Sequence, residues 1–253
     1  MSRFLIGEIP VDFLSEQEIQ TNIAEFFSSN RLKKNQTPAH IVTINSLMMN
    51  HTYKDSELLN AIKNADLIIP DSIGIITAGF LLGAKKSNAR LIRMPGIDLM
   101  LKICDYAQEV GLSVFLLGAK PDTIPETALK LKKLFPELRI AGFYHGYFDE
   151  NAEKYVFKEI KKSNPDIIFV GLNVPRQEKW IHKNLSKFSS KIVMGVGGSF
   201  DVISGKLKRA PFFMRLAGLE WLFRFLQEPW RIVRIKDLPV FFVRILKLSL
   251  RGA

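Results

Sequence analysis

The sequence predicts an α/β protein in which helices cover both faces of a parallel sheet, followed by a C-terminal helical appendage. Short apolar runs alternate with segments of helical spacing, and this alternation is typical of parallel sheets. The runs are apolar almost throughout, whereas a strand with one solvated face would alternate apolar and polar residues. At 253 residues, the chain is also long enough to bury an ample core.

Six apolar runs are predicted as buried strands. In chain order they cover residues 40–45, 67–70, 113–118, 138–143, 166–172 and 191–198. Two of the segments between them have clear helical spacing, and we expect one helix over 97–111, ending at Gly111, and another over 126–135, stopped by Pro136. These elements place an α/β domain at residues 1–210.

The pattern changes at about residue 211, after which no further strand is predicted. The segment reads as short helices interrupted at Pro229 and Pro239, with aromatic and aliphatic residues interleaved with arginines. We predict that residues 211–253 form a basic, apolar appendage that contacts a membrane surface. The alternative is a helix packed on its own domain or on another subunit of a homo-oligomer, and a segment that switches surfaces could do both.

The charge of the chain is concentrated at its C-terminal end. Residues 202–253 hold eleven Lys and Arg against three acidic residues, which gives +8 of the total +11. Such asymmetry indicates an anionic partner: a phosphate-bearing ligand, anionic lipid or nucleic acid. Nucleic acid is disfavoured, because the cations are interleaved with bulky apolar residues and no nucleic-acid-binding motif occurs.

The absence of a recognisable targeting signal and the low cysteine content agree with a cytoplasmic location. No stretch approaches the roughly 18 apolar residues of a membrane span, and acidic residues follow the N-terminus too early for a signal peptide. A single cysteine, Cys104, excludes an intrachain disulfide. We expect it to be a small core residue.

Asp71 is the first candidate for chemistry. In LIIPDSIG (67–74) it directly follows a predicted strand and directly precedes a predicted helix. Ligands of parallel sheets bind beyond the carboxyl ends of the strands, so Asp71 is placed to act as a general base. Aspartate is also a preferred helix N-cap, and the local pattern leaves both roles open.

Two further motifs follow later strands. In GVGGSFD (195–201), the residues Gly195, Gly197, Gly198 and Ser199 would let the backbone approach a phosphate or sugar closely. The motif departs from G-x-G-x-x-G, so it is weak evidence for a dinucleotide, although an NAD-dependent enzyme stays an alternative. Residues 176–179, in VPRQEKWI, are most simply read as a solvated first turn of a helix.

The residue pattern gives little support for a metal site or a cofactor, and we expect neither. The four histidines show no HxxxH or HxH spacing, and no D-x-D pair occurs. If a diphosphate leaves in the reaction, arginines and backbone amides must therefore carry its charge. Arg224, Arg231 and Arg234 fall on one helical face if Pro229 only kinks the segment, although three cations facing lipid or solvent would give the same spacing.

Several motifs together resemble one known family. PDSIG, RMPGIDLM (93–100), FLLGAKPD, GYF, VGLNVPRQEKW (170–180), GVGGSFDVISGKLKRAP (195–211) and GLEWLFR (218–224) stand in the order seen in the WecG/TagA/CpsF glycosyltransferases. The resemblance covers about residues 4–236. It implies a Rossmann-like domain with a C-terminal helical appendage at the inner face of the cell membrane.

The resemblance also implies an activity. Members transfer a sugar, typically N-acetylmannosamine, from a UDP donor to N-acetylglucosamine on undecaprenyl diphosphate, with inversion and without a metal, in cell-surface polymer synthesis such as that of teichoic acid or exopolysaccharide. We take the acceptor atom to be the 4-hydroxyl. N-acetylmannosaminuronic acid or glucose as the donor sugar is the alternative within the family. A nucleotide-binding protein or a membrane-bound scaffold, neither of them a transferase, represents the other classes.

Residue roles follow from the same resemblance. Asp71 matches the proposed catalytic base, and Thr43 and Asn45 match polar residues of its pocket. Two further pocket residues near the donor or acceptor match Arg93 and Gln177. The appendage residues thought to meet the diphosphate match Arg224, Arg231 and Arg234. The chain departs from its relatives at Ser72, where glycine is usual, and at residues 173–174, where a Gly-Ser or Gly-Ala pair is common.

Overall fold

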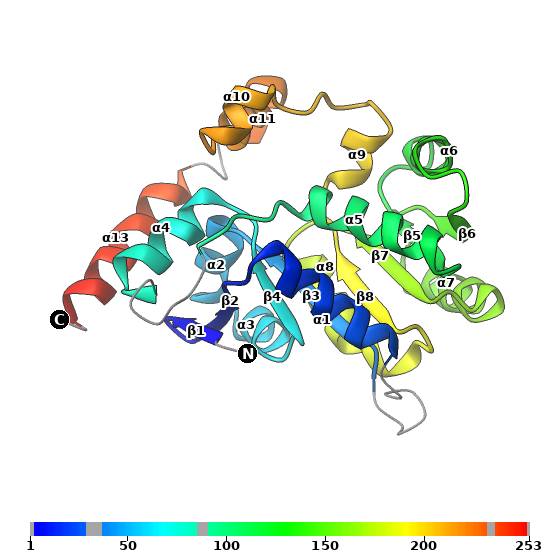
Figure 1. The fold of residues 1–253 in the computed structure, drawn as a ribbon, viewed down its shortest axis with the longest axis horizontal. Coiled ribbons are helices and arrows are strands. Elements are labelled where there is room, and N and C mark those ends of the chain that lie inside the picture. Colours follow the sequence, from blue (N-terminus) through cyan, green and yellow to red (C-terminus); the bar gives the residue numbers. More distant parts are fainter. Residues whose placement is uncertain (1–2, 29–36, 85–90, 232–235, 252–253) are drawn as a thin grey trace.

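The computed structural model describes residues 3–28, 37–84, 91–231 and 236–251 (Figure 1). Its centre is a six-stranded parallel sheet with the strand order β4-β3-β8-β7-β5-β6. All six predicted strands are present, which confirms the predicted α/β fold. They are β3 (Ala39–Ile44), β4 (Leu67–Pro70), β5 (Ser113–Gly118), β6 (Arg139–Tyr144), β7 (Ile167–Gly171) and β8 (Ile192–Gly195).

A short antiparallel hairpin precedes the sheet and was not predicted. It pairs β1 (Arg3–Ile6) with β2 (Ile9–Asp12). The hairpin is attached to the edge of the sheet by Asp12, whose buried carboxylate accepts hydrogen bonds from the Ile68 amide at 2.7 Å and from Arg3 Nε at 3.0 Å. A buried carboxylate is stable only with such partners, so this contact fixes the position of the hairpin.

One face of the sheet is covered by helices that share a single apolar core. Alternate strand residues, such as Ile41, Leu116 and Met194, point toward this core. The predicted helices are confirmed here as α5 and α6, and Cys104 is buried as expected. The helices of this face are α1 (Glu16–Ser28), α5 (Gly96–Glu109), α6 (Thr123–Leu134) and the short α9 (Ser199–Ile203).

The opposite face carries two apolar clusters. One packs against β5, β7 and β8, and the other against β3, β4 and the hairpin. The first involves α7 (Glu150–Ser163), α8 (Arg176–Asn184) and η3 (Leu185–Lys187). The second involves α2 (Ser46–Thr52), α3 (Ser56–Lys63) and α4 (Ile73–Leu81).

The C-terminal segment forms helices, as predicted, and α11 ends just before Pro229, but the predicted interruption at Pro239 is wrong, because Pro239 lies in the first turn of α13, where proline is tolerated. Figure 1 shows α10 and α11 above the sheet and α13 beside α4. Phe241 and Ile245 of α13 are fully buried in the cluster with α2 and α4. Within the described residues, no helix is long and apolar enough to cross a membrane. The helices are α10 (Phe212–Leu216), α11 (Glu220–Gln227), η4 (Pro229–Arg231) and α13 (Asp237–Arg251).

Candidate functional site

A cavity of about 560 Å³ lies beyond the carboxyl ends of β3, β4, β7 and β8, where ligands of parallel sheets bind. Helices α11 and α13 close part of it, because six residues from Gly218 to Gln227, together with Leu238 and Phe242, line the same space. The structure brings most of the predicted site residues together in its wall: Thr43, Asn45, Asp71, Arg93, Gln177, Gly197, Gly198, Ser199 and Arg224.

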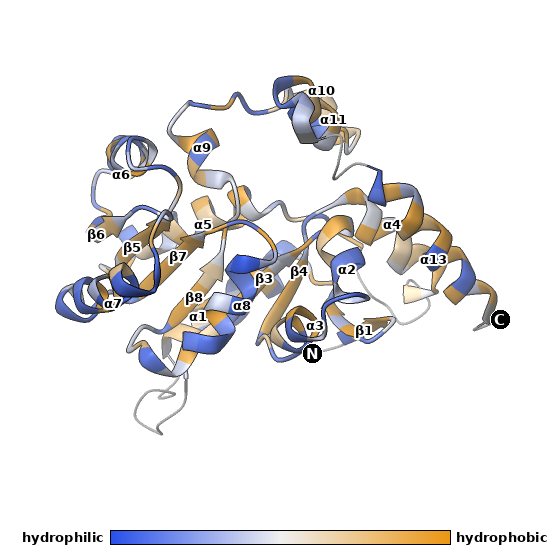
Figure 2. Cartoon of the chain, turned by 180° about the vertical axis from the view of Figure 1, so that it is seen from behind, coloured by the Kyte–Doolittle hydropathy of each residue, from blue (hydrophilic) through white to orange (hydrophobic). Residues whose placement is uncertain are grey.

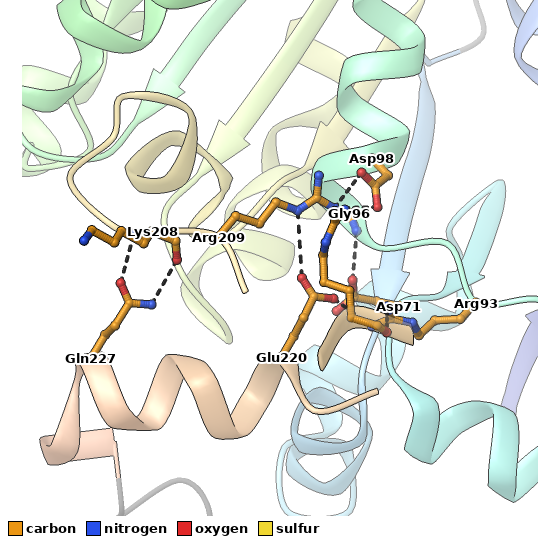
Figure 3. A network of polar contacts seen from close by, with 9 residues as sticks. Asp71, Arg93, Gly96, Asp98, Lys208, Arg209, Glu220 and Gln227 are labelled. Carbon is orange, nitrogen blue, oxygen red and sulfur yellow. Dashed lines mark hydrogen bonds and ion pairs between the residues drawn. The ribbon is translucent and has the colours of Figure 1, made fainter. Parts of the chain in front are cut away.

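Asp71 does not cap the helix that follows it. Ser72 is the N-cap residue of α4 and makes no side-chain capping bond. The Asp71 carboxylate instead turns toward the start of α5, where its Oδ1 accepts the Gly96 amide at 2.8 Å (Figure 3). Of the two roles left open by the sequence, capping of α4 is therefore wrong.

Asp71 is also electrostatically unusual. Burial raises its pKa to about 6, although the Gly96 amide opposes this increase. Glu220 raises the pKa further, whereas Arg93 and a hydrogen bond with Asn45 lower it. A carboxyl group that titrates near neutral pH and faces a cavity can accept a proton from a bound hydroxyl.

Thr43 and Asn45 support this carboxylate from the neighbouring strand. Asn45 caps α2, since its Oδ1 accepts the Met48 amide at 2.9 Å; a carboxylate can only accept, so the Asn45 amide group is the donor to Asp71. Thr43 packs on Gly96 so closely that a Cβ there would lie 2.7 Å from the Thr43 hydroxyl oxygen. Glycine at position 96 thus lets its amide reach Asp71.

The start of α8 is not a simple solvated turn, contrary to the reading from the sequence. Gln177 and Glu178 are buried. Gln177 Oε1 accepts the Gly197 amide at 2.8 Å, and its Nε2 donates to Glu178 Oε1 at 2.6 Å. A side chain at Gly195 would collide with Gln177, so Gly195 lies behind the cavity wall and supports Gln177. Gln177 in turn holds the glycine-rich loop.

Glu178 gives the first testable prediction. Burial raises its pKa to about 7, above the roughly 4.3 of an unfolded chain. The native state therefore binds the extra proton between these values, and this contribution to stability is lost as pH rises from about 4 to above 7. Glu178→Gln should gain roughly 3 kcal/mol relative to wild type between pH 4 and pH 8. Denaturant unfolding at both pH values measures the difference, and a pH-independent difference would contradict it.

The glycine-rich loop presents backbone to the cavity. Gly197 has φ +53°, a conformation that favours glycine. The Ser199 hydroxyl is directed inward and donates to the Val196 carbonyl at 2.6 Å. A side chain at Gly198 would collide with the guanidinium of Arg224. The loop and Arg224 therefore meet at one point of the wall.

Of the four arginines predicted for the site, the structure describes the side chains of two, Arg93 and Arg224. Arg224 Nε donates to Glu228 at 2.9 Å, which leaves its terminal nitrogens beside Gly198. Arg93 is bound to the C-terminal segment, with Glu220 at 2.8 Å and the Arg215 carbonyl at 2.9 Å. The side chain of Arg231 and the whole of Arg234 lie outside the described residues.

Reasoning from the sequence missed the polar network that joins the C-terminal segment to the start of α5 (Figure 3). Arg209 donates to both carboxylate oxygens of Asp98 at 2.6 Å. The side-chain amide of Gln227 bonds the backbone of Lys208 in both directions. The only signal for Glu220 in the sequence was its place in GLEWLFR, because Arg93, its hydrogen-bond partner, lies 127 residues away.

The chain is similar to proteins of known activity. Residues 4–253 match the model of the Glycosyl transferase WecG/TagA/CpsF family. An N-acetylglucosaminyldiphosphoundecaprenol N-acetyl-beta-D-mannosaminyltransferase of Bacillus subtilis (strain 168) is 34% identical over 83% of this chain and 79% of its own length. A protein of the same name from Staphylococcus aureus (strain MW2) is 35% identical, over 94% and 90% respectively.

Proposed function

Because this chain belongs to the WecG/TagA/CpsF glycosyltransferase family, we propose that it transfers N-acetylmannosamine from a UDP donor to N-acetylglucosamine on undecaprenyl diphosphate, in the synthesis of a cell-surface polymer. The names of the relatives given above contain the same acceptor and the same transferred sugar. The observation that carries the proposal is Asp71, whose carboxylate lines the cavity, is oriented by an amide and has a pKa of about 6.

The reaction is a single displacement with inversion. Asp71 removes the proton of the acceptor 4-hydroxyl while that oxygen attacks the anomeric carbon. The bond between the anomeric carbon and the phosphate oxygen breaks, and UDP leaves with the bonding electrons. An α-linked donor gives a β-linked product, and no covalent intermediate with the protein is needed. Asn45 and Gly96 hold the carboxylate while it accepts the proton.

The negative charge that develops on the leaving diphosphate is stabilised where Arg224 meets the glycine-rich loop. Arginine binds phosphate oxygens in a planar, charge-assisted geometry, and glycine lets the backbone amides of the loop approach the same oxygens. Gly197 and Gly198 provide this approach. We assign the same role to Arg231 and Arg234 by the family resemblance.

A donor screen tests the proposed function. Purified protein is incubated with a GlcNAc-diphospholipid analogue and UDP-N-acetylmannosamine, UDP-N-acetylmannosaminuronic acid or UDP-glucose, and the product mass is read. The expected product gains the mass of one N-acetylmannosamine residue. Transfer of one of the other two sugars would identify a different donor. Transfer of none of the three would overturn the proposed function, and affinity for NAD but not UDP would then favour a nucleotide-binding protein that is not a transferase.

The C-terminal helices also suit attachment to the inner face of the cell membrane. Phe213 is 69% exposed and Trp230 70% exposed, although large apolar side chains are usually buried. Figure 2 shows further apolar residues along α13, and Val243, Leu246 and Leu250 are exposed there. Lys247 is exposed on the same helix and adds positive charge, which attracts anionic lipid.

Binding to vesicles tests this attachment. Phe213→Ser and Trp230→Ser should each weaken binding to vesicles of mixed anionic and neutral phospholipid by about tenfold or more, since a buried aromatic side chain contributes roughly 1.5–3 kcal/mol. Leu129→Ser is the matched control, because Leu129 is 65% exposed but lies on α6. Cosedimentation measures the partition, and equal losses in all three variants would contradict the assignment.

A further inference from the structure

Two ion pairs join the C-terminal segment to the residues around Gly96. Arg93 Nη1 lies 2.8 Å from Glu220, and Arg209 Nη2 lies 2.6 Å from Asp98. All four side chains are mostly buried, so these pairs are screened less by solvent than surface pairs are. Figure 3 shows Glu220 between the two arginines, with its other carboxylate oxygen 4.0 Å from Arg209.

The position of these pairs matters because Gly96 holds Asp71. Arg93 precedes Gly96 by three residues, Asp98 follows it by two, and the Gly96 amide is the donor to Asp71 Oδ1. The Met94 amide is bound to the Pro70 carbonyl at 2.9 Å. A displacement of Arg93 or Asp98 would therefore move the amide that orients the carboxylate.

We infer that Glu220 is a positioning residue for Asp71: its ion pair with Arg93 fixes the segment 93–98, and through the Gly96 amide it sets the orientation of the base. This inference rests on the proposed function for the role of Asp71. Glu220 thus has a role distinct from that of Arg224, Arg231 and Arg234, which act on the leaving diphosphate. It also makes the geometry of the base depend on the docking of α11.

The negative charge of Glu220 also affects the pKa of Asp71. The groups that act on Asp71 are Glu220, Arg93, the Gly96 amide and Asn45, and the charged or titratable residues elsewhere in the cavity wall are His51, Lys208, Arg209 and Arg224. Glu220 is the group of like charge, and it raises the pKa of Asp71. A base with a raised pKa takes up a proton more readily, so the charge of Glu220 strengthens the base that its ion pair orients.

Substitution of Glu220 tests the inference by titration of Asp71. The carboxyl carbon of Asp71 is followed by NMR in protein labelled at aspartate, and its signal is assigned by its loss in Asp71→Asn. Glu220→Gln and Glu220→Ala should both lower the pKa of Asp71. Glu57→Gln is the matched control, because Glu57 also forms an ion pair, with Lys179 at 3.1 Å, but does not line the cavity. It should leave the pKa unchanged.

Two further measurements separate positioning from a general loss of structure. Hydrogen exchange of the Gly96 amide should become faster in Glu220→Ala, while protection of the central strands stays as in wild type. The kcat of Glu220→Ala should fall by about tenfold or more, with the donor KM changed much less, and Glu220→Gln should restore part of the kcat because glutamine can still accept from Arg93.

The results can be read even if the proposed function fails. Titration and hydrogen exchange need no turnover. A protein that transfers none of the three sugars would overturn the proposed function, but the effect of Glu220 on the Asp71 pKa and on the Gly96 amide could still be measured. An unchanged Asp71 pKa in both Glu220 variants, together with unchanged exchange at Gly96, would overturn the inference.

Discussion

Replacing Asp71 by asparagine should lower kcat by about 10²- to 10⁴-fold, the range that general-base assistance contributes. Asparagine has nearly the same shape, and its carbonyl oxygen can still accept the Gly96 amide that now binds Asp71 Oδ1. It cannot take up the proton of the acceptor hydroxyl. The variant should therefore keep its fold and its affinity for UDP, which calorimetry measures separately from turnover.

The pH profile provides the control for this prediction. Because the pKa of Asp71 is about 6, the wild-type kcat/KM should fall about tenfold for each pH unit below 6 as the base becomes protonated. This acid limb should be absent in Asp71→Asn. A variant that retains more than about a tenth of the wild-type rate, well above what the loss of a general base allows, would show that another group accepts the proton.

The sheet could be predicted because its strands are buried on both faces. Each appears as a short apolar run, such as LIIP at β4, and its signal needs no knowledge of distant residues. The β1–β2 hairpin was missed for the opposite reason. Its two strands have four residues each, and their place is set by Asp12, which bonds the Ile68 amide far along the chain.

The residues of the site also differ in whether they have a local signal in the sequence. Asp71 and Asn45 could be found because each directly follows a strand, and parallel strands bring such positions together. Glu220 and Asp98 could not, because their roles arise from ion pairs that span 127 and 111 residues respectively. The burial of Glu178 was hidden as well, since a charged residue in the first turn of a helix usually faces solvent.

The last helix packs on the α/β domain, which is the alternative that the sequence left open for the C-terminal segment. Helix α13 inserts Phe241 between α2 and α4. Phe241 is 0% exposed, and its ring lies next to Gly74, where an added Cβ would be 3.4 Å away. Its packing therefore links α13 to the helix that begins directly after Asp71 and Ser72.

Replacing Phe241 by alanine should lower the free energy of unfolding by about 3–5 kcal/mol, because it removes buried apolar surface and leaves a cavity. Leu246→Ala is the matched control: it changes the same helix, but Leu246 is 52% exposed, and substitution of an exposed residue usually costs less than about 0.5 kcal/mol. Denaturant unfolding of both variants gives the comparison. Equal stability of the two would mean that α13 leaves the core in solution, so that its docking could not hold the cavity closed beside Asp71.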